Sequence, residues 1–86
     1  MPEISRFLGI VIAMYYNDHS PPHFHARYSD SEIKVNIEDG EIISGEFPRR
    51  AQRLVLEWLE LHRNELREDW SLAQERKPLN KIEPLE

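Results

Sequence analysis

The sequence contains no cysteine among its 86 residues. Disulfide bonds and thiolate chemistry are therefore excluded, and a metal site could use only histidine, aspartate and glutamate as ligands. The chain also has no long apolar run, because the longest one, "FLGIVIAMYY", stops at ten residues, about half of the roughly 20 that a membrane-spanning helix needs. The opening "MPEISRF" lacks the basic stretch and apolar core of a signal peptide. We therefore expect a cytoplasmic protein without a membrane span.

The balance of charged and apolar residues indicates one small folded domain. Hydrophobic residues make up 40% and charged residues 31% of the chain, and the net charge is −5. Such a composition is typical of a globular protein, and the acidic balance argues against broad, non-specific binding to nucleic acid. The length fits a single domain over residues 1–86. A domain of this size buries only about 60–65% of its unfolded surface, so association with another chain would help its stability.

The hydrophobic pattern of the first half predicts a four-stranded antiparallel β-meander within residues 7–45. Residues 7–16 are apolar on both alternating faces, which favours one central strand. Residues 23–28 and 32–37 alternate between apolar and polar, as half-buried strands do. Asp39-Gly40 is typical of a two-residue hairpin loop, which would place Ile37 opposite Ile42 at the start of a short last strand.

The second half predicts a helical part over residues 48–76 and an extended tail over residues 77–86. Pro48 suits a helix start, and apolar residues then recur at spacings of three and four: Ala51, Leu54, Val55, Trp58, Leu59, His62, Leu66, Trp70 and Ala73. One helix over the whole segment would be roughly 40 Å long and would overshoot the sheet. A break near residues 62–64, capped by Asn64, is therefore favoured over one long helix. The resulting fold class is α+β, with the helical part packed on one face of the sheet. The other face would need cover from the tail or from a second subunit, so we expect a homo-oligomer.

The stretch "NDHSPPHFHARY", residues 17–28, is the strongest candidate for a site because it holds three of the four histidines. Strand alternation places His23, His25 and Arg27 on one face. The two imidazoles, with His19 or Asp18 from the double-proline turn as a third ligand, would suit zinc or another divalent transition metal. Arg27 argues against a metal, because a cation beside a divalent ion is unfavourable unless a carboxylate or a substrate anion intervenes.

Two other interpretations of the same residues remain open. In a metal-independent RNA-cleaving site, His23 and His25 would act as general base and general acid, and Arg27 would stabilise the developing negative charge. Alternatively, the histidine face has a structural role or meets a partner protein. Arg49, Arg50 and Arg53 stand at a helix start, where the dipole favours anions. They are therefore candidates, with Arg27, for binding a phosphate or a partner's carboxylates.

Three segments carry a family resemblance: "MPEISRFLGIVIAMYYNDHSPPHFHARY", "FPRRAQRLVLEWLELHRNELREDW" and "LNKIEPL". Together they span almost the whole chain, and they resemble small bacterial proteins of the domain-of-unknown-function family 4160. The family has no assigned activity or catalytic residues. Its genes often lie beside another short gene, a context that suggests toxin–antitoxin-like pairs. The resemblance therefore implies a protein-interaction module acting with a second small protein encoded nearby, rather than an enzyme. The alternatives are a metal-binding protein or metal-dependent hydrolase using His19, His23 and His25, and a metal-independent protein that cleaves or binds RNA.

Overall fold

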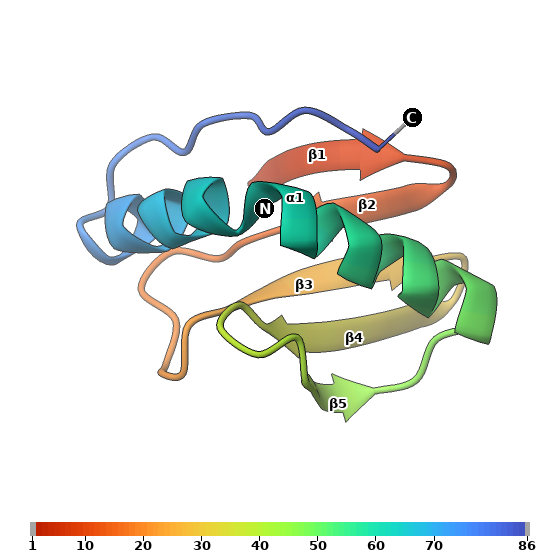
Figure 1. The fold of residues 1–86 in the computed structure, drawn as a ribbon. Helices are drawn as coiled ribbons and strands as arrows, with labels where there is room; N and C mark the ends of the chain where they lie inside the picture. Colours follow the sequence, from red (N-terminus) through yellow and green to blue (C-terminus); the bar gives the residue numbers. More distant parts are fainter. Residues whose placement is uncertain (1, 86) are drawn as a thin grey trace.

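The computed structural model describes residues 2–85, which form one antiparallel sheet, one helix and an extended tail (Figure 1). The five strands lie in the sheet in the order of the sequence. They are β1 (Glu3–Phe7), β2 (Ile10–Ala13), β3 (His23–Tyr28), β4 (Ser31–Asn36) and β5 (Ile42–Gly45), and helix α1 (Arg49–Gln74) follows them. The α+β class and the antiparallel meander are confirmed, whereas the predicted number of four strands is wrong.

The extra strand arises at the N-terminus, where the predicted single strand over residues 7–16 is in fact the end of β1, a tight turn and β2. Leu8 and Gly9 form the turn with φ values of 51° and 83°. Leucine is rarely found at a positive φ, so neither Leu8 nor its apolar neighbours indicate a turn at this position. The apolar residues on both sides, Phe7 and Ile10, point into the core and are at most 5% exposed, which is why the two strands look like one.

The β4–β5 connection is longer than the two-residue loop that Asp39-Gly40 predicts. The backbone N–H of Asn36 donates to the carbonyl of Glu41 at 2.9 Å, and the N–H of Gly40 donates back to the carbonyl of Asn36 at 2.9 Å. Ile37 therefore lies in the loop, where its side chain turns into the core and is fully buried. Val35, and not Ile37, is the strand partner of Ile42.

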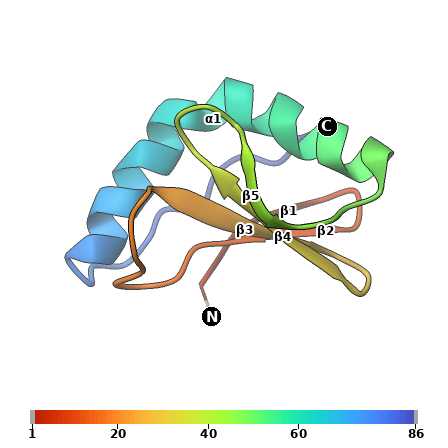
Figure 2. The same cartoon turned by 90° about the horizontal axis from the view of Figure 1, so that it is seen from below.

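Helix α1 covers one face of the sheet and bends around its end (Figures 1 and 2). Trp58 is fully buried, and its ring lies 5.7 Å from that of Phe24 and 5.5 Å from that of Phe7. The helix is a single element of 26 residues, but His62 has non-helical angles (φ −126°, ψ 22°) that kink it. The favoured break is thus a bend. It turns the second half of the helix toward the start of β3, so a long helix fits a short sheet.

The tail, residues 77–85, returns along the outer edge of β1 (Figure 1). The N–H of Ile82 donates to the carbonyl of Ile4 at 2.8 Å, and the indole N–H of Trp58 donates to the carbonyl of Glu83 at 2.8 Å. The tail therefore shields the β1 edge. Among residues 2–85, no helix lies on the sheet face opposite α1 (Figure 2). We call this the open face, and its expected cover by a second subunit stays a prediction.

Candidate metal site on the open face of the sheet

Strand β3 directs two histidines to the open face. Phe24 packs against Trp58 of α1, and Phe24 and Ala26 are both fully buried. Their strand neighbours His23 and His25 therefore point to the other face. Despite facing away from the helix, the two histidines are only 5% and 8% exposed. Nearby side chains and the preceding loop therefore enclose them, unlike most residues of an open sheet face.

His23 is held by a backbone carbonyl. Its Nδ1 lies 2.7 Å from the carbonyl oxygen of Pro21, and its Nε2 lies 3.0 Å from Oδ2 of Asp18. A carbonyl can only accept a hydrogen bond, so Nδ1 carries the proton and donates it. Nε2 is then the nitrogen directed at Asp18: it donates to the carboxylate when it carries a proton, and it presents a lone pair when it does not. The ring of Trp70, from the bent half of α1, lies 5.3 Å from the His23 ring and fixes its position.

His25 is held through its Nδ1 atom as well, here by a carboxylate. Its Nδ1 lies 3.1 Å from Oε2 of Glu32, and its Nε2 lies 3.5 Å from the same Oδ2 of Asp18. Because an ionised carboxylate only accepts hydrogen bonds, Nδ1 of His25 is the donor to Glu32. The Tyr15 ring packs edge-on at 4.4 Å from the His25 ring. Nε2 of His25 is therefore also the nitrogen directed at Asp18, and it is free to bind a metal ion once it is deprotonated.

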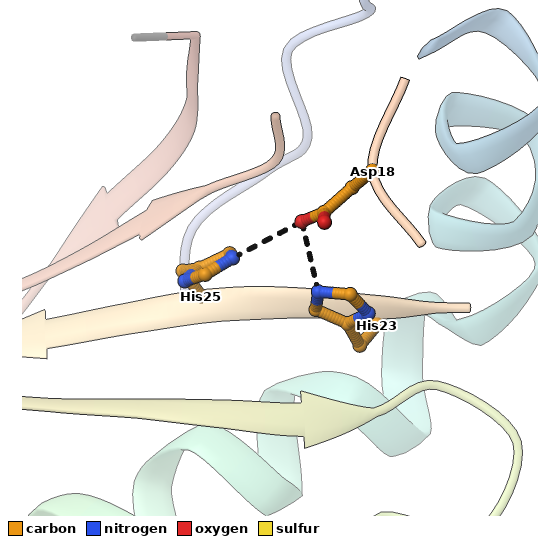
Figure 3. A group of neighbouring side chains, drawn as sticks. All are labelled: Asp18, His23 and His25. Atoms are coloured by element: carbon orange, nitrogen blue, oxygen red, sulfur yellow. Dashed lines mark hydrogen bonds and ion pairs between the residues drawn. The ribbon is translucent and has the colours of Figure 1, made fainter. Parts of the chain in front are cut away.

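The third member of the cluster, Asp18, comes from the loop between β2 and β3 (Figure 3). The end of α1 holds this loop: the N–H of Asn17 donates to the carbonyl of Ala73 at 3.2 Å, and the amide of Gln74 donates to the carbonyl of Asp18 at 3.2 Å. Burial acts to raise the pKa of Asp18. The N–H of His19 and the two imidazoles outweigh that effect, so the pKa lies below its usual value. Asp18 is therefore ionised at neutral pH.

Together the three side chains form a convergent set of ligand atoms. One atom from each of Asp18, His23 and His25 lies within 4.8 Å of the others, and Figure 3 shows both imidazoles directed at one carboxylate oxygen. Two lone pairs and a carboxylate repel one another unless a cation, either added protons or a metal ion, lies between them. Two histidines and one carboxylate are a ligand set typical of zinc and other transition metals.

The structure separates the site residues predicted from the sequence. Asp18, His23 and His25 come together, whereas the imidazole of exposed His19 is not part of the convergent set. Arg27 is on the open face, but its strand partner is Glu32, the carboxylate that binds His25. A carboxylate bonded to His25 is therefore the strand neighbour of Arg27, which weakens the electrostatic objection to a metal.

Two contributors were missed by sequence reasoning, Glu32 and Trp70. Glu32 reaches His25 because Lys34, two residues further along β4, pairs with His25, so both β4 side chains lie on the histidine face. Alternation within 32–37 already placed Glu32 outward, and that was a usable signal. Trp70 reaches His23 only because α1 bends at His62, which no local pattern indicates.

The hollow directly beside His25 is very small. The hollow next to His25 holds about 10 Å³ and is lined by Val11, Ala13, Tyr15 and Arg27. That is room for about one water molecule. The remaining predicted binding residues, Arg49, Arg50 and Arg53, lie on α1, which covers the opposite face of the sheet from Arg27. The four arginines therefore do not gather on one face.

Comparison with known proteins gives a family and nothing more specific. No curated protein and no solved structure matches the chain. No helical segment among residues 2–85 combines the length and apolar character that crossing a bilayer requires. The family defined by a domain of unknown function, DUF4160, matches residues 9–71, which is more than half of the chain. The chain therefore belongs to the DUF4160 family.

Proposed function

We propose that this protein binds a divalent transition-metal ion, with Zn²⁺ as the first candidate, through Asp18, His23 and His25. One observation carries the proposal. Each imidazole donates its Nδ1–H to a fixed acceptor, and each directs Nε2 at the same oxygen of Asp18. Hydrogen bonds from the non-ligating nitrogen to a carboxylate or carbonyl are the usual support of metal-binding histidines.

The spacing of the ligand atoms supports the same conclusion. Zinc bonds to nitrogen and oxygen are about 2.0–2.2 Å long in a tetrahedral site, so ligand atoms around the ion stand roughly 3.3–3.5 Å apart. The Oδ2 atom of Asp18 lies 3.0 Å from Nε2 of His23 and 3.5 Å from Nε2 of His25. Small side-chain adjustments would therefore admit an ion without moving β3.

Three protein ligands leave a coordination position for another group. The adjacent hollow of about 10 Å³ accommodates a water molecule but not an organic substrate. This supports a structural or regulatory metal, or one that takes its last ligand from a docking partner. The small hollow gives no support to a hydrolase acting on small molecules, because the polar side chains that line it are only Tyr15, His25 and Arg27.

The alternative of metal-free RNA cleavage receives less support from the geometry. General acid and general base must stand on opposite sides of the reacting phosphate, because one deprotonates the nucleophile while the other protonates the leaving group. The Nε2 atoms of His23 and His25 instead point at one carboxylate oxygen, and both Nδ1 atoms are already bonded. Neither imidazole presents a free nitrogen to a substrate.

Calorimetric titration with Zn²⁺, and with Co²⁺ as a coloured substitute, tests the proposal on protein purified without chelators or a histidine tag. We expect one ion per chain, and visible Co²⁺ absorption of the strength typical of four-coordinate sites. Asp18→Ala and His25→Ala should each weaken binding at least 100-fold. His19→Ala is the matched control, because it removes a neighbouring imidazole that is outside the cluster. If His19→Ala weakens Zn²⁺ binding as much as His25→Ala does, or if His25→Ala leaves Zn²⁺ binding unchanged, the assignment of these ligands is overturned.

A further inference from the structure

A second feature lies at the opposite end of β3 from the metal cluster and is independent of it. A cavity of about 280 Å³ opens between the β1–β2 turn, the end of β3 and the start of α1. Its walls are mainly apolar and include Leu8, Ile10, Tyr28 and Leu54, with Arg50 as the charged member. Leu8 is 60% exposed at the rim, an unusual position for a large apolar side chain without a partner.

Three arginines without ion-pair partners stand at the start of α1, and one of them, Arg50, lines the cavity. Arg49, Arg50 and Arg53 are exposed, and within residues 2–85 their side chains form no ion pair or hydrogen bond. Three other arginines behave differently: Arg6, Arg63 and Arg67 each pair with a glutamate at 2.7–2.8 Å. The first turn of α1 contains no acidic residue either. A chain with a net charge of −5 thus leaves concentrated positive charge beside an apolar hollow.

We propose that the cavity and its three arginines form a docking site for an acidic peptide segment of a partner protein, with one aliphatic side chain of that segment filling the cavity. The number of unpaired cations exceeds what a single carboxylate can neutralise, which points to a run of Asp or Glu residues. The cavity volume suits one branched side chain and is too small for a lipid chain. Charge complementarity and shape therefore select the same kind of ligand.

The composition of the cavity distinguishes a peptide from a nucleic acid. Single-stranded nucleic acid is held by stacking its bases on exposed aromatic rings as well as by cations. The aromatic ring in this cavity, Tyr28, is half-buried and packs edge-on against Phe47 at 6.1 Å. Apart from Tyr28 and Arg50, the residues that line the cavity are aliphatic, and a sugar–phosphate backbone would leave the space between them unfilled.

Fluorescence anisotropy with the full chain and a labelled probe tests this site. The probe is the heptapeptide Glu-Asp-Glu-Leu-Glu-Asp-Glu, and its counterpart has alanine in place of leucine. We expect the leucine probe to bind in the micromolar range, the alanine probe to bind at least tenfold more weakly, and both to weaken as salt rises. Arg50→Glu should weaken the leucine probe at least tenfold. Arg76→Glu is the matched control, because it makes the same charge change at the other end of α1 and should alter binding less than twofold.

Several outcomes would overturn the proposal. The first is no detectable binding of the leucine probe at 1 mM protein, and the second is equal affinity for the leucine and alanine probes. The third is an equal loss of affinity for the leucine probe in Arg50→Glu and Arg76→Glu. A labelled uridine decamer is the RNA probe. If it binds more tightly than the leucine probe, and if Arg50→Glu abolishes that binding, the cavity and its arginines are an RNA site instead. Amide NMR spectra of both variants establish that they are folded. Leu8→Ala, a change at an exposed turn, provides a second variant. It should weaken the affinity for the leucine probe threefold or more and leave the affinity for the alanine probe unchanged.

Discussion

Zinc should raise the melting temperature of this protein by about 10–20 °C, because the proposed ligands meet only in the folded chain. Asp18 is in the β2–β3 loop, while His23 and His25 are on β3, and the three are brought together only by the folded chain. An ion that binds the native state alone adds RT ln(1 + [L]/Kd) to the free energy of unfolding. That is about 2.7 kcal/mol at a free ion concentration of 100 Kd. For a domain of 60–100 residues, each kcal/mol shifts the melting temperature by about 4–8 °C.

The assay is a thermal melt followed by circular dichroism, with free Zn²⁺ buffered at 100 times the measured Kd. Asp18→Ala should abolish the shift, and His19→Ala should retain it. A shift below about 2 °C in the unmodified protein would refute the reasoning, since it would mean that the ligands do not converge only in the native state. A full shift in Asp18→Ala would place the ion elsewhere.

Three further predictions address the support of the site and the stability of the fold. Glu32→Gln should weaken Zn²⁺ binding about 10–100-fold by removing the carboxylate that orients His25, and calorimetric titration would measure this; unchanged affinity would contradict that role. Burial raises the pKa of Asp69, so the folded state favours the protonated carboxyl. Its contribution to stability is complete below about pH 4, where the unfolded chain is protonated as well, and is lost as the pH rises through the folded-state pKa. The free energy of unfolding of Asp69→Asn relative to the unmodified protein should therefore increase between about pH 4 and pH 7, by about 1.4 kcal/mol per unit of pKa shift, whereas parallel urea-denaturation profiles would exclude this linkage. Gly45→Ala should destabilise the fold by about 2–3 kcal/mol, because its Cβ would lie 2.0 Å from the carbonyl oxygen of Glu32, while at Gly40 the nearest side-chain atom is 3.5 Å away. Equal urea midpoints for Gly45→Ala and Gly40→Ala would show that this contact does not matter.

Much of the architecture follows from local sequence signals. The period of two in residues 23–37 and the period of three to four after Pro48 are sufficient to predict the meander and the helix. Both are imposed by one buried face on each element. The same alternation placed His23 and His25 together on the open face. These features were predictable because each depends on neighbours in the sequence.

The features that sequence reasoning missed depend on exceptions or on distant contacts. The turn at Leu8 requires a positive φ at leucine, against its intrinsic preference. Ile37 lies just past the end of β4, where its N–H donates to the carbonyl of Pro22 at 3.0 Å and its side chain is fully buried. Trp70 and Gln74 reach the histidine cluster only through the bend at His62. Residue patterns report which face is buried, but not where a helix bends or which distant side chain fills the space.

The second small protein and the homo-oligomer expected from the sequence remain predictions. The arginine-lined cavity gives the interaction hypothesis a specific surface with a specific chemistry. Because it lies at the other end of β3 from His23 and His25, this cavity and the proposed metal site can be tested separately. Loss of peptide binding in Arg50→Glu with unchanged Zn²⁺ affinity would show that they act independently.

The most direct test of the central claim is a crystal structure of the zinc-loaded protein with anomalous diffraction data on both sides of the zinc absorption edge. The account predicts one strong anomalous peak per chain, about 2.0–2.2 Å from Nε2 of His23, Nε2 of His25 and a carboxylate oxygen of Asp18. A zinc-loaded crystal with no peak at this position, or with its peak at His19 or His62, would contradict it.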